Sequence, residues 1–379
     1  MPIAAAADRE IADATTRTRR LFFVYALLTA ASICVLIGSG GLVTSKGAGL
    51  AVPDWPTSYG YNMFAFPVSR WVGGVLYEHA HRLIASAVGF LTIGLAIFAW
   101  RAEPRKWVRA LAYAAVGAVI FQGVLGGLRV VWLKDSIGIF HALLAQAYLA
   151  LVCLIALVAS PAWLRRASTI QNPKSKIQNS DAALRALGRA ALVATLLIYG
   201  QLALGAAMRH AHAGLSIPDF PRAYGRWWPR ADAATVAQIN AARDAAGQPP
   251  TTGAQIHLQM LHRFGALAVL MAVSLCAARA WRRRAALPAG VRRLALGWPV
   301  LIAAQIVLGI YTIWTNKAAD VATLHVLVGA GALVWGVLLT ARVREETHRL
   351  LAASAAAAAP VRRVSADSVN VATPTALAR

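Results

Sequence analysis

The 379-residue chain carries a formal net charge of +23, and 58% of its residues are hydrophobic while 14% are charged. Soluble globular domains average about 45–50% apolar and about 25% charged residues, so this composition excludes an ordinary soluble domain. Lys and Arg gather in alternate connections and at both termini, not on one face, which excludes nucleic acid as a partner. We therefore expect an all-α integral membrane protein in contact with membrane lipid.

Eight apolar stretches are long enough to cross a hydrocarbon core of about 30 Å, which takes about 20 helical residues. They cover residues 21–45, 80–100, 108–132, 137–160, 186–209, 257–280, 293–314 and 320–342. No small-residue cleavage site obviously ends the first stretch, so we expect it to be retained. The positive-inside rule then places both termini in the cytoplasm.

One loop sequence occurs twice. "GLAVPDWPTSYG" at residues 49–60 returns as "GLSIPDFPRAYG" at 214–225, and "QGVLGGLRVVW" in the third stretch resembles "QIVLGIYTIW" in the seventh. "QLALGAAMR" in the fifth has the same Gln-to-Gly spacing. Such matches indicate a tandem duplication, and an even number of spans per copy makes the two copies parallel. We interpret the glycines mainly as residues that let helices pack closely.

The duplication predicts five segments along the chain. Two parallel four-helix units are joined by a linker and flanked by a cytoplasmic N-terminal arm and a cytoplasmic, disordered tail. In chain order these are the arm at 1–20, the first unit at 21–165, the linker at 166–184, the second unit at 185–343 and the tail at 344–379.

Each unit places one histidine on its second helix and one on its fourth. His81 matches His262, and His141 matches His325. All four helices start from the outer side, so we expect the four histidines in the outer half of the bilayer. Ionisable residues inside membrane spans are usually functional, and two imidazoles from facing helices are what axial ligation of haem requires. The sequence therefore predicts two porphyrin sites.

Zinc is the competing metal, but it would require a third or fourth ligand nearby. The cysteines lie singly within apolar spans and are interpreted as buried hydrophobic residues; they are Cys34, Cys153 and Cys276. Four further histidines lie near the same membrane surface without a mate in the other repeat. We interpret them as interfacial residues or neighbours of the haem ligands, with a role in ligand access as the alternative; they are His79, His210, His212 and His257.

The two copies differ at Glu78, whose repeat mate is Gln259. Glu78 precedes His81 by three residues, so on a helix the two side chains share a face. A carboxylate beside one haem and an amide beside the other indicate one reactive site and one electron-transfer site. Glu78 is the candidate base or charge stabiliser, and the alternatives are a helix N-terminal carboxylate or an ion pair with Arg82.

The remaining candidates lie beside the histidines and in the repeated loop. Arg82 and Arg263 each follow a histidine and could pair with haem propionates or extend toward the membrane interface. Asp54 and Asp219 favour turns, and the neighbouring prolines restrict the backbone. We interpret each loop as a rigid lid over a porphyrin edge, with direct catalysis by Asp54 as the alternative.

The run from "GGLVTSKGAGLAVPDWP" through "YEHAHR", with the later "HR" and the histidines of the fourth and eighth spans, resembles the haem A synthase family over about residues 20–343. The resemblance implies a bacterial cytoplasmic membrane enzyme that oxidises a ring methyl of haem O to the formyl group of haem A for cytochrome oxidase. It implies haem b as a cofactor on His262 and His325, with Arg263 nearby, and haem O between His81 and His141.

The resemblance also implies receipt of haem O from a haem O synthase and delivery of haem A to cytochrome oxidase assembly; a homo-oligomer is compatible with it. Some branches of the family carry a cysteine pair in an outer loop, but residues 46–78 and 210–256 contain none here, which excludes thiol chemistry in those loops. Two alternatives stay open. They are a non-catalytic di-haem b cytochrome that passes electrons from quinol, and a haem exporter or chaperone.

Overall fold

The computed structural model describes residues 2–165 and 177–358, and within these ranges it is built from helices and loops without strands. Eight helices are long and apolar enough to cross a membrane, which confirms the predicted all-α integral membrane fold. These helices are α1 (Pro2–Ser45), α2 (Gly73–Ala102), α3 (Lys106–Trp132), α4 (Asp135–Ala159), α6 (Ile177–His210), α8 (Gly253–Arg282), α9 (Ala289–Trp314) and α10 (Ala319–Ala358).

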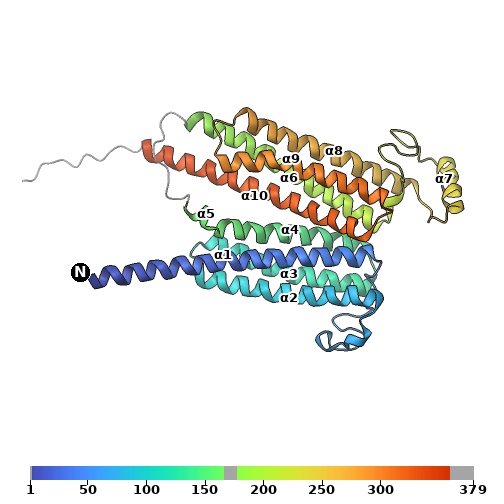
Figure 1. Ribbon diagram of the computed structural model, residues 1–379, viewed down its shortest axis with the longest axis horizontal. Helices are drawn as coiled ribbons and strands as arrows, with labels where there is room; N and C mark the ends of the chain where they lie inside the picture. Colours follow the sequence, from blue (N-terminus) through green and yellow to red (C-terminus); the bar gives the residue numbers. More distant parts are fainter. Residues whose placement is uncertain (1, 166–176, 359–379) are drawn as a thin grey trace, which may run out of the picture.

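The helices form two four-helix bundles that lie side by side (Figure 1). Helices α1 to α4 make one ring of neighbours, and α6, α8, α9 and α10 make the other. The bundles meet where α1 packs on α10, α4 on α10 and α4 on α6. Exchanging α1 with α6 and α4 with α10 leaves this set of contacts unchanged, so the arrangement fits the expected tandem repeat.

Each bundle has its own apolar core, and hydrogen bonds join buried polar side chains within it, since lipid offers them no partner. In the first bundle the Tyr148 hydroxyl bonds the hydroxyl of Thr92, and both residues are buried. In the second, the fully buried indole of Trp298 donates to the carbonyl of Ala332 at 3.2 Å. The cores position the transmembrane helices, and with them the histidines.

Several helices continue beyond the predicted spans. Helix α10 runs to Ala358, although a disordered tail was expected from 344, because residues 343–358 are rich in the helix formers Ala, Leu, Arg and Glu. Glu345 also pairs with Arg349 at 2.6 Å, one helical turn later. Helix α6 begins at Ile177, inside the predicted linker. Residues 166–176 and 359–379 of the expected linker and tail lie outside the described residues.

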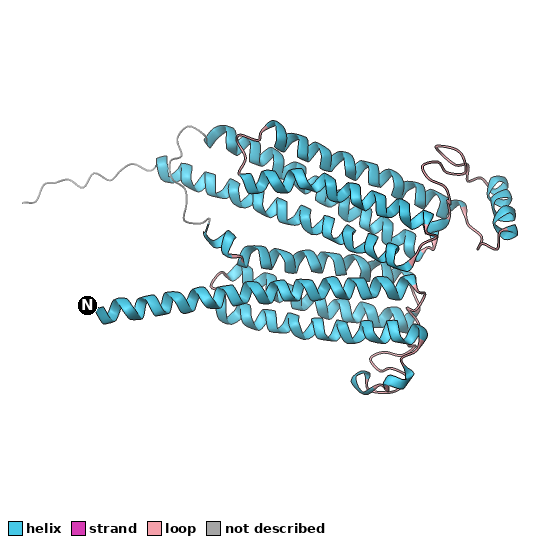
Figure 2. Cartoon of the chain, in the orientation of Figure 1, coloured by secondary structure: helices cyan, strands magenta, loops and turns pink. Residues whose placement is uncertain are grey.

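The long connections gather at one end of the molecule, opposite the start of α1 (Figure 2). The first, between α1 and α2, contains two single turns of 3-10 helix, η1 (Met63–Ala65) and η2 (Val68–Arg70). The second, between α6 and α8, contains η4 (Ala213–Leu215) and the helix α7 (Ala233–Ala245), which Asp232 caps. All four candidate histidines lie within about the first three turns of helices that start at this end.

Candidate functional site

Each of the four candidate histidines lies against a glycine of a neighbouring helix. A Cβ atom added to any of these glycines would lie 2.9–3.3 Å from the Cε1 atom of the facing ring, closer than ordinary van der Waals contact. The pairs are Gly40 with His81, Gly126 with His141, Gly205 with His262 and Gly309 with His325. The sequence analysis assigned such glycines to helix packing, but these four also leave the space that the imidazoles occupy.

Three glutamines hold the helices that carry the histidines. In each case the side-chain amide donates to the backbone carbonyl of a histidine at 2.8 Å. The pairs are Gln122 with His141, Gln201 with His262 and Gln305 with His325. The glutamine lies four residues before the glycine in all three helices, so each "QxxxG" segment contacts both the backbone and the ring of one histidine. The repeated Gln-to-Gly spacing was the sequence signal for this arrangement.

The fourth histidine, His81, has a serine instead. The Ser39 hydroxyl lies 2.8 Å from the His81 Nδ1 atom and 2.8 Å from the Leu36 carbonyl. A carbonyl can only accept, so the hydroxyl donates to Leu36 and accepts from the Nδ1–H of His81. The Nε2 atom then keeps a free lone pair, which is the form in which imidazole binds a metal. Sequence reasoning missed Ser39.

The site geometry fits a haem group better than it fits zinc. The His262 and His325 rings approach from facing helices, with centroids 6.5 Å apart. In the first bundle His81 and His141 are close enough to interact electrostatically. The Nδ1 atoms of His141 and His325 are buried without a hydrogen-bond partner. Nowhere in the described ranges do three or more His, Cys, Asp or Glu side chains form a metal-binding group, so each site offers only two imidazoles, the donor set of bis-histidine haem.

Glu78 and Arg82 fasten the first repeated loop to helix α2. The Glu78 side chain is 4% exposed; one carboxylate oxygen accepts from the Val52 N–H at 2.9 Å and the other pairs with Arg82 at 2.7 Å. Arg82 also donates to the carbonyls of Asp54 at 2.6 Å, Val52 at 2.8 Å and Thr57 at 3.0 Å. Its guanidinium is therefore engaged mainly by the loop.

In the second half, Gln259 and Arg263 fasten the second repeated loop to α8 in the same way, with an amide in place of the carboxylate. Gln259 is 3% exposed, and its side-chain oxygen accepts from the Ile217 N–H at 2.6 Å. Arg263 donates to the carbonyls of Asp219 at 2.8 Å and Arg222 at 3.0 Å, and its guanidinium lies over the Phe220 ring. An amide and a carboxylate can thus hold the same loop in the same way.

The loops themselves share one turn. Asp54 accepts from the N–H groups of Tyr59 at 2.7 Å and Gly60 at 2.8 Å, and Asp219 accepts from the matching residues, Tyr224 and Gly225. Burial opposes ionisation of Asp54, but hydrogen bonds from Gly60, Thr57 and Tyr59 outweigh it and hold the carboxyl pKa below its usual range. Both aspartates therefore bond backbone groups within their own loops.

The proline and aromatic residues of the two loops also correspond. The Trp55–Pro56 and Phe220–Pro221 peptide bonds are both cis. Trp55 lies so close to Gly127 of α3 that any side chain at Gly127 would overlap its indole. The first loop thus contacts both α2, through Arg82, and α3, through Trp55.

The four unmatched histidines occupy different surroundings. His79 is fully buried, with its ring between Phe66 and Trp71, and it belongs to the packing of the first loop. His210 of α6 lies directly against Gly138 of α4, at the junction of the two bundles. Two are exposed at the surface of the second connection and the start of α8; they are His212 and His257.

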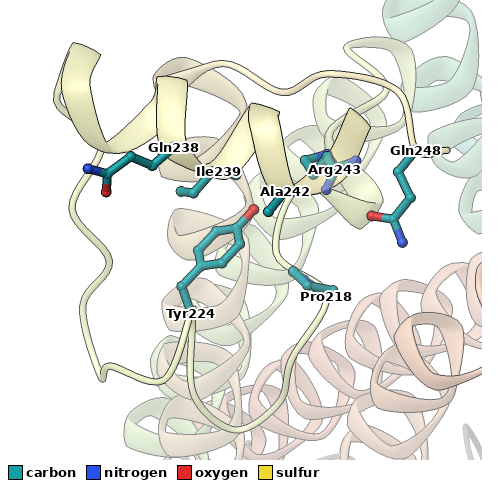
Figure 3. Close-up of a pocket in the computed structure, with 7 residues that line it drawn as sticks. All are labelled: Pro218, Tyr224, Gln238, Ile239, Ala242, Arg243 and Gln248. Atoms are coloured by element: carbon teal, nitrogen blue, oxygen red, sulfur yellow. The ribbon is translucent and has the colours of Figure 1, made fainter. Parts of the chain in front are cut away.

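Helix α7 covers the second loop, and no such helix covers the first in the described structure. Arg243 of α7 donates to the Leu215 carbonyl at 3.1 Å and the Pro249 carbonyl at 2.8 Å. Figure 3 shows Tyr224 of the loop pointing toward α7 across a small pocket. Its lining residues are Pro218, Tyr224, Gln238, Ile239, Ala242, Arg243 and Gln248. The pocket is part of this packing contact.

Several proteins named "Heme A synthase" are similar to the chain. The relative from Shouchella clausii is 30% identical over 208 residues, which cover 54% of this chain and 64% of the relative. That from Alkalihalophilus pseudofirmus is 31% identical over 139 residues, covering 36% of this chain and 46% of the relative. The match to the Bacillus cereus protein is longer, with 24% identity over 310 residues, 80% of this chain and 86% of the relative. The first two matches thus span less than two thirds of the relatives' length.

A protein-family model described as "Cytochrome oxidase assembly protein" (COX15-CtaA) matches residues 23–339. This range begins in α1 and ends in α10, so it contains all eight candidate membrane-spanning helices in whole or in part, both repeated loops and all four glycine-packed histidines. The chain therefore belongs to the COX15-CtaA family of cytochrome oxidase assembly proteins.

Proposed function

We propose that the protein is a haem A synthase, a membrane oxidoreductase that converts a ring methyl of haem O to the formyl group of haem A. The observation that carries the proposal is the pair of bis-histidine sites, each ring packed on a glycine and one pair in each bundle. The names of the similar proteins and the family support it.

The two bundles have different tasks in this proposal. His262 and His325 hold haem b as an electron-transfer cofactor in residues 185–343, and Arg263 keeps the loop above it in place. His81 and His141 flank haem O in residues 21–165. The polar differences between the halves support the assignment, since the ionisable Glu78 is replaced by an amide in the second half.

Bound haem iron supplies the one-electron redox chemistry that amino-acid side chains lack. Converting a methyl to a formyl group is a four-electron oxidation: with water as the source of the oxygen atom, it releases four protons and four electrons, and the electrons must pass to an external acceptor. Glu78 serves as the proton acceptor, and the N–H of Val52 and the guanidinium of Arg82 orient its carboxylate. Ser39 keeps the lone pair on His81 Nε2, and the first loop excludes water from above.

The protein is proposed to lie in the cytoplasmic membrane with both termini in the cytoplasm and the histidine sites toward the outer face. The basic connections between alternate helices support this orientation. The histidines lie near the starts of α2, α4, α8 and α10, and these helices start at the end of the molecule opposite the start of α1 (Figure 1). We further propose that haem O arrives from a haem O synthase and that haem A passes to cytochrome oxidase assembly.

A non-catalytic di-haem b cytochrome and a haem exporter or chaperone are the alternatives. Chromatography of haems extracted from the protein, purified after aerobic co-expression with a haem O synthase, separates the three. We expect a haem A peak that is absent from a Glu78→Ala control. Two haem b per chain without haem O or haem A would instead favour the cytochrome, and loosely held porphyrin without any oxidised product would favour the exporter.

A further inference from the structure

One face of helix α3 is directed at His141. Gln122 bonds the His141 carbonyl and Gly126 packs on its ring. Arg129 follows Gly126 by three residues and Gln122 by seven, so all three side chains share one face of the helix. Arg129 therefore lies about one turn from the His141 contact, toward the end of the bundle that carries the repeated loops.

The Arg129 guanidinium lies over the start of the first repeated loop. Its two terminal nitrogens are 2.8 and 2.9 Å from the place where Gly49 would carry a Cβ atom, so a side chain at this position would require the guanidinium to move. The charge acts electrostatically on both His81 and His141. Across the described ranges the guanidinium makes neither a hydrogen bond nor an ion pair, although Arg129 is half-buried.

Two other partly buried arginines at this end of the bundles already have hydrogen-bond partners. Arg82 is engaged by the first loop and Glu78, and Arg209 donates to the Gly41 carbonyl at 2.6 Å and to Ser45 at 2.7 Å. In the second half the residue that aligns with Arg129 is Thr312, whose hydroxyl bonds the Leu308 carbonyl. A partly buried cation without an anionic partner thus occurs beside the first histidine pair and not at the matching place.

We propose that Arg129 binds a propionate carboxylate of the porphyrin held between His81 and His141. A partly buried guanidinium needs an anion and hydrogen-bond acceptors, and a carboxylate supplies both in a charge-assisted, often bidentate, contact. The proposal rests on the proposed function, because it requires a porphyrin in the first bundle. It makes Arg129 a group that selects and orients the substrate, distinct from Arg82, which holds the loop.

The test compares iron protoporphyrin IX with its dimethyl ester, which lacks the carboxylates. Both are titrated by absorbance into the detergent-solubilised full chain carrying His325→Ala, so that the first site gives the bis-histidine spectrum. With Arg129 present, we expect the diacid to bind about 10- to 100-fold more tightly than the ester. Arg129→Leu should remove that preference, and Arg129→Lys should restore part of it.

Lys134→Leu is the matched control, because it removes one positive charge from an exposed position at the same end of the molecule and should keep the preference. Retention of haem b by Arg129→Leu in the chain with intact His325 reports that the variant folds. An unchanged preference in Arg129→Leu, or an equal loss of affinity for diacid and ester, would overturn the assignment of Arg129. If the parent binds neither porphyrin, the first-bundle site of the proposed function is wrong, and the role of Arg129 fails with it.

Discussion

The two bundles of this protein share a scaffold and differ in a few polar groups. The glycine under each ring, the turn of each loop and the arginine that fastens it are common to both. The differences concern the residue three positions before the first histidine, the residue before the glycine that faces this histidine, and the residue three positions after the glycine of the third helix. In repeat order they are Glu78 and Gln259, Ser39 and Leu204, and Arg129 and Thr312.

Under the proposed function, this comparison separates the features that would hold a porphyrin from those that would act on it. Features present twice serve binding and enclosure, since both halves need them. The groups found only in the first half can ionise, donate or pair with an anion, while their mates are an amide, an alkyl chain and a bonded hydroxyl. The second loop is in addition covered by α7, and no such helix covers the first loop in the described residues. Under the proposed function, the covered site would keep its cofactor and the uncovered site would exchange its substrate.

The largest effect is expected for Glu78→Gln. The substitution places glutamine at the position that matches Gln259 in the second half. Gln259 accepts a hydrogen bond from the N–H of Ile217 in its loop, so an amide can fill this structural role. The fold and the haem content should therefore survive, while haem A formation falls about 10²- to 10⁴-fold with loss of the base. Haem A formed at the parental rate, measured by chromatography of extracted haems, would remove Glu78 from the chemistry.

Gly126→Val should empty the first site selectively. The new side chain would overlap the His141 ring, and overpacking of this kind costs about 1–3 kcal/mol, enough to weaken porphyrin binding by up to about 10²-fold. The haem-to-protein ratio measures the loss. Gly123→Val, three residues earlier, is the control because Gly123 has open space beside it. Equal haem loss in both variants would show a general helix defect and not displacement of the ring.

Arg263→Leu tests whether the attachment of the second repeated loop to α8 matters for the bound haem. It removes charge-assisted hydrogen bonds to the second loop, each contributing about 1.5–3 kcal/mol. We expect haem b to dissociate about tenfold faster or more, together with faster proteolysis in residues 214–225. Full haem retention would count against any role of Arg263 in holding the cofactor. Faster haem loss with an unchanged cleavage rate would instead indicate direct contact with a propionate.

Ser39→Ala should have the smallest effect. It removes one neutral hydrogen bond from His81, a contribution of about 0.5–1.5 kcal/mol, so affinity for haem in the first site should fall only a few-fold. The spectrum and midpoint potential of that haem should shift, because the hydrogen bond to a histidine ligand tunes the metal. Leu204→Ser, at the matching place, provides the reciprocal variant. An unchanged potential in Ser39→Ala would contradict the assigned hydrogen bond.

The sequence predicted the membrane helices, because apolar length leaves a direct pattern. Internal repetition led to the proposed histidine pairs, and the His262 and His325 rings do face each other. The sequence did not predict the helical ends, where alanine-rich segments continue past the apolar core, although the Asp232 cap and the alanines after it could have identified α7. It also did not assign Arg82 and Arg263 to the loops, since their acceptors lie 25–46 residues away in the chain. The contacts of Gly126 and Arg129 could not be predicted either, because they depend on how α3 packs against α4 and the first loop.

The central claim is that the first bundle binds haem O and the second binds haem b. The most direct test is to identify the haems that two variants, each lacking one histidine ligand, retain. His141→Ala and His325→Ala would be purified after aerobic co-expression with a haem O synthase, and their extracted haems separated by chromatography. We predict that His141→Ala retains haem b and lacks haem O and haem A, whereas His325→Ala loses haem b. Loss of the same haems from both variants, or loss of haem b from His141→Ala alone, would contradict the account.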